Sequence, residues 1–88
     1  MATKILIPTP LRTYTAMQDT IEVEGSTVGE LLSNMTSTYT ELRKHLFTED
    51  GKLRNFVNIY VNDDDIRYLD KEETPVSSDD TVSIVPSV

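Results

Sequence analysis

The sequence predicts an α+β fold in which one main helix packs across a mixed sheet of about five strands. Three observations lead to this prediction. A single amphipathic segment follows a helix-capping pattern, short segments rich in β-branched residues flank it, and 88 residues are enough for only one domain. We therefore expect residues 1–88 to form one domain with a modest core.

Two short strands are predicted before the helix. Residues 3–7 contain a compact apolar run of strand length, and two prolines end it. Residues 8–18 are rich in threonine and proline, which predicts a loop. Residues 20–23 alternate polar and apolar side chains, as a half-buried strand does, and Gly25 ends that alternation.

The helix is predicted from its N-terminal cap. Thr27 stands three residues before Glu30, which is the spacing of a capping box. Apolar residues then recur along one side of a helix: Val28, Leu31, Leu32, Met35 and Tyr39. A second short helical turn is predicted around Leu42, Leu46 and Phe47.

The second half of the chain completes the predicted sheet. Residues 56–61 form the clearest strand, and its odd-numbered side chains should face the core. Residues 62–65 predict a tight turn and residues 66–69 a short returning strand. Residues 70–81 are acidic and turn-rich, and residues 82–86 form the last strand. If the first and last strands pair in the centre, the architecture is a β-grasp, the ubiquitin-like roll.

The composition narrows the classes of partner. Fifteen acidic residues outnumber eight basic ones and give a formal net charge of −7. Such a surface repels phosphate backbones and anionic lipid headgroups, so a basic patch on another protein is a better partner than nucleic acid or a membrane. The absence of cysteine excludes disulfides and thiol chemistry. The sequence has no secretory signal pattern and no apolar run of about 20 residues, so we expect a cytoplasmic protein. We also expect it to be a monomer.

No pattern in the chain predicts a catalytic or metal site. The run Asn62-Asp63-Asp64-Asp65 lacks the glycine and the distal glutamate of a calcium loop, so a solvated turn explains it. His45 follows two basic residues near the end of a helical segment, where it complements the helix dipole, and no nucleophile accompanies it. The run Ser77-Ser78-Asp79-Asp80 predicts a turn, because a serine nucleophile needs a base beside it.

The outward side of the central strands is the candidate docking site. Side chains alternate between the two faces of a strand, so Leu6 should point outward from the first strand and Val85 from the last. Together with Tyr60 they would form one exposed apolar patch, and contiguous patches mark contact sites. The alternative is that a loop of the same chain packs over the patch, and periodicity does not decide between the two.

The order of motifs resembles a known family. The segments "IPTPLR", "STVGELL", "FVNIYVNDDDIRYL" and "TPVSSDDTVSIVP" occur in the order shown by the ThiS/MoaD family of ubiquitin-like sulfur carriers. The resemblance covers nearly the whole chain. It is most specific in residues 51–69, which are similar to the branch that delivers sulfide for cysteine biosynthesis. The molybdopterin and thiazole branches are the near alternatives.

The resemblance implies a carrier and not an enzyme. In that family an E1-like partner uses ATP to adenylate the C-terminal carboxylate, and sulfur then replaces the activated oxygen. The thiocarboxylate donates sulfide to a client enzyme, here a cysteine synthase that uses pyridoxal phosphate. The resemblance implies no cofactor bound to the chain itself. The acidic surface of the folded domain would favour association with a basic partner. Pro86, Ser87 and Val88 would begin the arm that enters the partner.

The sequence departs from the family's pattern at its end. The family ends in Gly-Gly, whereas this sequence ends "VPSV" with no glycine after Gly51, so no residue here takes the reactive role. A truncated sequence, a processed precursor and a carrier-like protein that never carries sulfur are three explanations, and we favour a missing tail. Two other functions stay open: a non-covalent β-grasp binding module, and a ubiquitin-like modifier attached to lysines.

Overall fold

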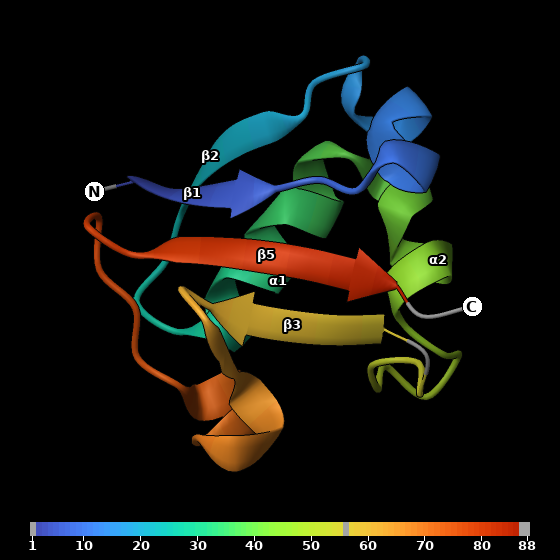
Figure 1. Ribbon diagram of the computed structural model, residues 1–88. Coiled ribbons are helices and arrows are strands. Elements are labelled where there is room, and N and C mark those ends of the chain that lie inside the picture. Colours follow the sequence, from blue (N-terminus) through green and yellow to red (C-terminus); the bar gives the residue numbers. More distant parts are fainter. Residues whose placement is uncertain (1, 56, 87–88) are drawn as a thin grey trace.

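A computed structural model describes residues 2–55 and 57–86. It contains a five-stranded mixed sheet with the strand order β2-β1-β5-β3-β4 (Figure 1). The strands are β1 (Ala2–Leu6), β2 (Thr20–Glu24), β3 (Val57–Val61), β4 (Asp64–Asp65) and β5 (Thr81–Pro86). The α-helices are α1 (Val28–Thr38) and α2 (Arg43–Leu46), and the 3₁₀ helices are η1 (Thr9–Thr15), η2 (Thr40–Leu42), η3 (Ile66–Tyr68) and η4 (Lys71–Glu73). Phe56, the predicted first residue of the clearest strand, lies outside the described residues.

The first and last strands pair in the middle of the sheet. β1 and β5 run parallel, with Ile5 opposite Val82, and the other neighbouring strands are antiparallel. A parallel strand pair needs a crossover connection, and α1 lies on that crossover. The sheet with its helix packed across it is the β-grasp fold, so the predicted fold class is confirmed.

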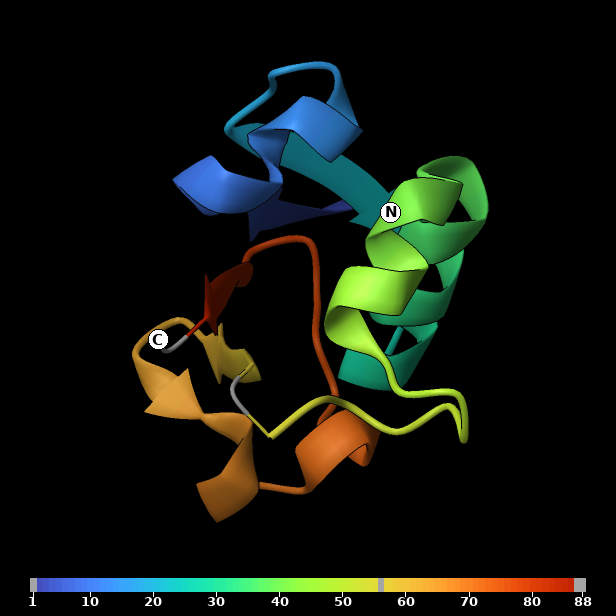
Figure 2. The ribbon, with the colours of Figure 1, turned by 90° about the vertical axis from the view of Figure 1, so that its right-hand side faces the viewer.

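The two α-helices lie on one face of the sheet (Figure 2). The predicted apolar side of α1 is buried, and Leu31, Leu32 and Met35 are each 0% exposed. Full burial of such a side chain stabilises a fold by about 1.5–3 kcal/mol. The helix ends at Thr38, so Tyr39 is its half-buried C-cap and not a member of the helix. In the described part of the chain, no helix is long and apolar enough to cross a membrane.

The cap of α1 differs from the predicted capping box in one bond. The amide of Glu30 donates to Thr27 Oγ1 at 3.2 Å, as predicted. The Glu30 carboxylate reaches one residue farther than expected and accepts from the Ser26 amide at 2.9 Å and the Ser26 hydroxyl at 3.1 Å. The hydrogen bond from the Ser26 amide, and then the one from the Ser26 hydroxyl, lower the pKa of Glu30. The cap is therefore strongest when this carboxylate is ionised.

The prediction of a loop over residues 8–18 is wrong for most of that segment. Thr9–Thr15 form η1, which buries Leu11 and Thr15 against the core. A short 3₁₀ helix with two inward residues carries no apolar stripe long enough to be detected. Pro10 ends the preceding strand but does not prevent a helix, because proline fits the first turn of a helix, where no amide is needed.

The prediction for residues 62–69 is also wrong in part. The predicted turn contains β4, whose Asp64 pairs with Val61, and the predicted returning strand is the 3₁₀ helix η3. The side chain of Asp65 caps η3 by accepting from the Arg67 amide at 2.9 Å. Three apolar residues in a segment of four, Ile66, Tyr68 and Leu69, do not distinguish a period of 2 from a period of 3.

The two ends of the sheet carry different segments. β1 and β5 end, and β3 begins, at one end of the sheet, which we call the tail end; there Val57 pairs with Pro86. η1 follows β1 at the tail end, and α2 lies beside it (Figure 1). The opposite end holds residues 62–80, which connect β3 to β5 and include η4, in residues predicted only as turns.

Candidate functional site

The three predicted docking residues surround one position on the outward face of the sheet. Ser83 of β5 is opposite Leu6 on one side and opposite Tyr60 on the other. Val85 is the next residue of β5 on the same face, because side chains two apart share a face. The structure therefore brings all three residues together, on the side that strand alternation predicts. Their role in docking stays a prediction.

Exposure tests whether loops of the same chain pack over these residues. Leu6 is 41% exposed and Val85 is 44% exposed, so no loop in the described ranges covers them. Tyr60 is half-buried and lines a hollow of about 580 Å³ together with Arg67, Tyr68 and Leu69. We call Leu6, Tyr60 and Val85 the sheet patch.

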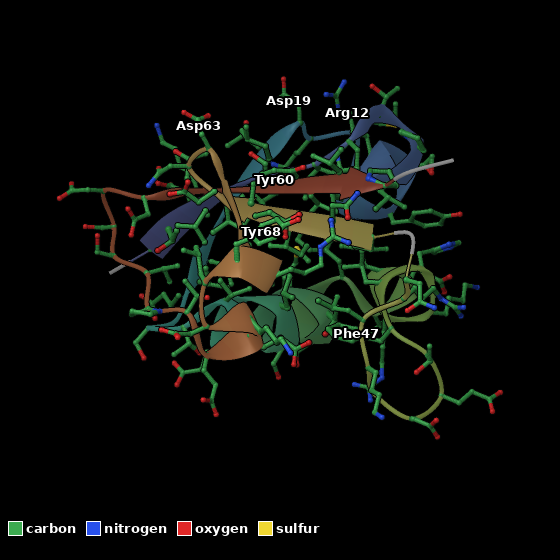
Figure 3. All side chains as sticks on the ribbon, turned by 60° about the horizontal axis from the view of Figure 1, so that its bottom comes forward. Arg12, Asp19, Phe47, Tyr60, Asp63 and Tyr68 are labelled. Atoms are coloured by element: carbon green, nitrogen blue, oxygen red, sulfur yellow. The ribbon has the colours of Figure 1, made fainter. Side chains whose placement is uncertain are left out.

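Two further apolar residues lie beside the sheet patch, and sequence reasoning missed both. Tyr68 is 86% exposed and Leu69 is 42% exposed. Tyr60 on β3 and Tyr68 on η3 lie in the same region of the surface (Figure 3). The prediction of a strand over residues 66–69 did not indicate this pair, because neighbouring side chains in a strand point to opposite faces of the sheet. The aspartate two residues before Arg67 was the available signal, since Asp is a preferred N-cap.

An ion pair fixes the floor of the hollow beside Tyr60. The guanidinium of Arg67 donates to Asp65 from Nη2 at 2.7 Å, and from Nε at 3.1 and 3.2 Å. These bonds lower the pKa of Asp65, with the Arg67 side chain as the main cause and its amide as the second. The same pairing raises the pKa of Arg67. The pair therefore stays ionised at neutral pH. It links Asp65 of β4 to Arg67 of η3.

The chain leaves the sheet next to the sheet patch. β5 carries its last described residue, Pro86, to the tail end, one residue after the exposed Val85. Ser87 and Val88, the rest of the predicted arm, lie outside the described residues. A partner that covers the sheet patch is therefore also close to the point where the chain continues beyond Pro86.

The acidic runs build turns in the described structure. Within residues 2–55 and 57–86, no cluster of three or more side chains is placed to hold a metal ion. Asp80 accepts from Asn62 Nδ2 at 3.1 Å and from the Ser77 amide at 2.9 Å. The bond from Asn62, and then those from Ser77, lower the pKa of Asp80. This carboxylate ties the β3–β4 turn to the start of β5, which fits the predicted turn.

His45 lies in the last turn of α2, the position predicted for it, and it also joins two elements at the tail end. Its ring stacks on Tyr14 of η1, with centroids 4.4 Å apart and planes inclined by 27°. Its Nε2 is buried, and no described group forms a hydrogen bond with it. His45 therefore packs α2 against η1.

Comparison with known proteins shows full-length similarity to sulfur carriers. The chain is 37% identical to the sulfur carrier protein CysO of Mycobacterium tuberculosis, an alignment that covers 100% of this chain and 97% of that protein. The crystal structure of the Amycolatopsis orientalis BexX/CysO complex contains a chain with a TM-score of 0.91 and 38% identity, covering 99% of this chain and 97% of that one. The M. tuberculosis CysO crystal structure matches with a TM-score of 0.89 and 36% identity over 98% of this chain and 99% of that one.

The similarity extends to a protein family. The family model described as the ThiS family matches residues 5–88. This range includes α1, all of the sheet except the first residues of β1, and the tail end. The chain therefore belongs to the ThiS family.

Proposed function

We propose that the protein is a sulfur carrier whose C-terminal thiocarboxylate donates sulfide to a biosynthetic enzyme, and that this enzyme makes cysteine. The observation that carries the proposal is the similarity to CysO over the full length of the chain. The geometry supports it, because β5 brings the chain out beside an exposed apolar patch. Such an arrangement suits a protein whose terminus reacts inside a partner.

The chemistry would take place at the terminal carboxylate of the mature chain. An E1-like adenylyltransferase joins a carboxylate oxygen to the α-phosphorus of ATP and releases pyrophosphate. A sulfur nucleophile then attacks the acyl carbon, and AMP leaves with the electron pair of the acyl–oxygen bond. The thiocarboxylate that results delivers its sulfur to the client, a cysteine synthase with its own pyridoxal phosphate. The described residues of this chain would only bind and position.

The sheet patch is the surface proposed to dock these partners. It offers two exposed aliphatic side chains and the ring of Tyr60, and Tyr68 and Leu69 enlarge it. Central apolar anchors supply most of the binding energy in protein interfaces. The BexX/CysO complex shows that a relative forms a complex with a partner protein, which supports a docking surface on this fold.

Intact mass tests the proposal directly. The full-length gene product is incubated with ATP, an E1-like adenylyltransferase from the same organism and a sulfide source. We expect a mass increase equal to one oxygen-for-sulfur exchange, located at the C-terminus by fragmentation and absent without ATP. No exchange, with the partner shown to be active on another carrier, would refute the sulfur-carrier function.

A ubiquitin-like modifier is the second candidate, because relatives of that description also match. The small archaeal modifier protein 3 of Haloferax volcanii is 32% identical over 74% of this chain and 70% of that protein. A modifier would form isopeptide bonds to lysines of other proteins. Extracts that contain a tagged chain distinguish the two: lysine conjugates that resist thiols support the modifier, and a free thiocarboxylate form supports the carrier.

Two alternatives concern the client and the tail. A molybdopterin or thiazole client would leave the activation step unchanged, so sulfur transfer to each purified client enzyme identifies the recipient. A non-covalent binding module would bind its partner through the sheet patch without any change in mass.

We expect the chain to act as a monomer in the cytoplasm.

A further inference from the structure

A groove runs along β3 on the side away from β5. It has a volume of about 600 Å³, within the range of ligand sites, and three segments line it. Residues 52–55 form one wall, residues 57–59 of β3 form the floor, and residues 65–67 with 71–72 form the other wall. We call this the β3 groove. It is distinct from the sheet patch, because Leu6 and Val85 do not line it.

The β3 groove gathers cations in an acidic protein. Four of the eight basic residues of the chain line it: Lys52, Arg54, Arg67 and Lys71. Arg67 is paired with Asp65. The other three have no salt bridge in the described structure, and Glu72 is the one acidic lining residue outside the Arg67 pair. The groove is therefore a local positive site on a chain with a net charge of −7.

Two of these basic residues have distinctive local structure. The guanidinium of Arg54 donates from Nε to the carbonyl of Lys44 at 2.9 Å, which fixes this side chain at the tail end. Lys71 has a φ of 56°, a left-handed backbone that non-glycine residues rarely adopt. Such conformations persist where the surroundings impose them, and functional sites are enriched in them.

The floor of the groove is a partly open strand edge. β3 pairs with β5 along its whole length, from Val57 to Val61. On its other side β4 pairs only with Tyr60 and Val61. In the described ranges, residues 57–59 have no strand neighbour on that side. An extended segment can therefore lie along β3 there, as in recognition by strand addition.

From the charge and the open edge together, we infer that the β3 groove binds an extended, carboxylate-bearing segment of a partner protein. Lys52, Arg54 and Lys71 would contact the carboxylates, and β3 would set the direction of the segment. The groove reaches Val57, which is opposite Pro86, so this segment would lie beside the point where the chain leaves the sheet. The inference does not depend on sulfur chemistry.

The test uses a capped synthetic peptide of alternating glutamate and valine as the probe. It is titrated into the ¹⁵N-labelled full chain and followed by NMR. We expect saturable shifts of amides in residues 52–59 and 65–72, and binding that weakens as salt is added, because charge contacts are screened. The matching peptide of alternating lysine and valine should not shift the amides of the groove, because its charge is suited to the acidic residues 62–80 instead.

Basic residues inside and outside the groove supply a matched pair of variants. The double variant K52E/K71E reverses two groove charges, and K4E/R43E makes the same change in net charge at residues that do not line the groove. All four residues are exposed, so both variants should fold, which their amide dispersion checks. We expect about a tenfold weaker peptide affinity for K52E/K71E and little change for K4E/R43E.

Three results would overturn the inference. Equal weakening in both double variants would show a response to net charge alone. Shifts at Leu6 and Val85 in place of the groove would move the site to the sheet patch. The absence of any shift at low salt would remove the site altogether. Each of these leaves the exchange of oxygen for sulfur at the C-terminus unaffected, so this inference and the proposed function fail separately.

Discussion

Ile84 and Val85 are neighbours in β5 with opposite surroundings. Ile84 is 3% exposed and packs in the core, whereas Val85 is on the sheet patch. One residue of β5 therefore contributes to stability and the next is available for binding. The same division holds on β3, where Ile59 is buried and Tyr60 faces the hollow.

A carboxylate at each kind of position separates docking from folding. Val85→Asp should leave the domain folded and weaken binding to the E1-like partner, because the new charge lies in a desolvated contact. Ile59→Asp should unfold it, since a buried unpaired carboxylate costs several kcal/mol. Thermal melts and calorimetric titration measure the two effects. Normal partner binding by Val85→Asp would show that docking uses another surface.

Asp80 makes the fold sensitive to acid. Its pKa is lowered in the folded state, so its contribution is complete above the unfolded value of about 3.9 and is lost as the pH falls through the folded pKa. Asp80→Asn should lower the melting temperature at neutral pH and flatten its decline below about pH 4. Asp79→Asn is the control, because that side chain accepts no described hydrogen bond. If the melting temperatures of wild type and Asp80→Asn fell in parallel as the pH was lowered, the role of the Asp80 carboxylate would be contradicted.

His45 holds a buried nitrogen without a described partner, which costs stability. His45→Phe keeps a ring against Tyr14 and removes the polar atom, so it should raise stability by about 1 kcal/mol. His45→Ala loses the stacked contact and should lower stability. Denaturant melts compare the three proteins. A His45→Phe protein less stable than wild type would indicate that Nε2 is bonded in solution.

The connection from β2 to α1 depends on close approach of the backbone. A Cβ atom added to Gly25 would lie 3.0 Å from the amide nitrogen of Leu31 and 3.1 Å from its side chain. Gly51 has a φ of 82°, but a Cβ there meets nothing within 4 Å. Gly25→Ala should therefore destabilise by more than Gly51→Ala, for which only the left-handed backbone costs about 1–2 kcal/mol. Equal melting temperatures for the two variants would contradict the packing at Gly25.

The elements that sequence predicts well are those with a long local pattern. The apolar side of α1 repeats over three turns, and β3 and β5 alternate over five and six residues. η1 and η3 are shorter than the pattern needed to detect them. η1 depends on tertiary packing, because Leu11 is buried in the core, whereas η3 depends on a local cap, in which the Arg67 amide donates to Asp65. Tyr68 and the β3 groove depend on these elements, so sequence reasoning missed both.

The charge of the whole molecule is unevenly distributed. Residues 62–80 contain eight acidic residues and two basic ones, and they lie opposite the tail end. The segments at the tail end have five basic residues, Arg12, Arg43, Lys44, Lys52 and Arg54, and four acidic ones, Asp19, Glu41, Glu49 and Asp50 (Figure 3 labels Arg12 and Asp19 there and Asp63 at the other end). Net charge alone suggested a basic partner. The structure limits that expectation to the acidic end, because the surface around Pro86 is not acidic overall.

The state of the terminal carboxylate in the cell tests the central proposal most directly. The tagged full-length protein is purified rapidly from its own organism, and the mass of its C-terminal proteolytic fragment is measured by mass spectrometry. A sulfur carrier should show a fraction in which one oxygen is replaced by sulfur, and this fraction should disappear when the E1-like gene is deleted. A terminus that is always a plain carboxylate, in cells that are actively making cysteine, would contradict the proposed function.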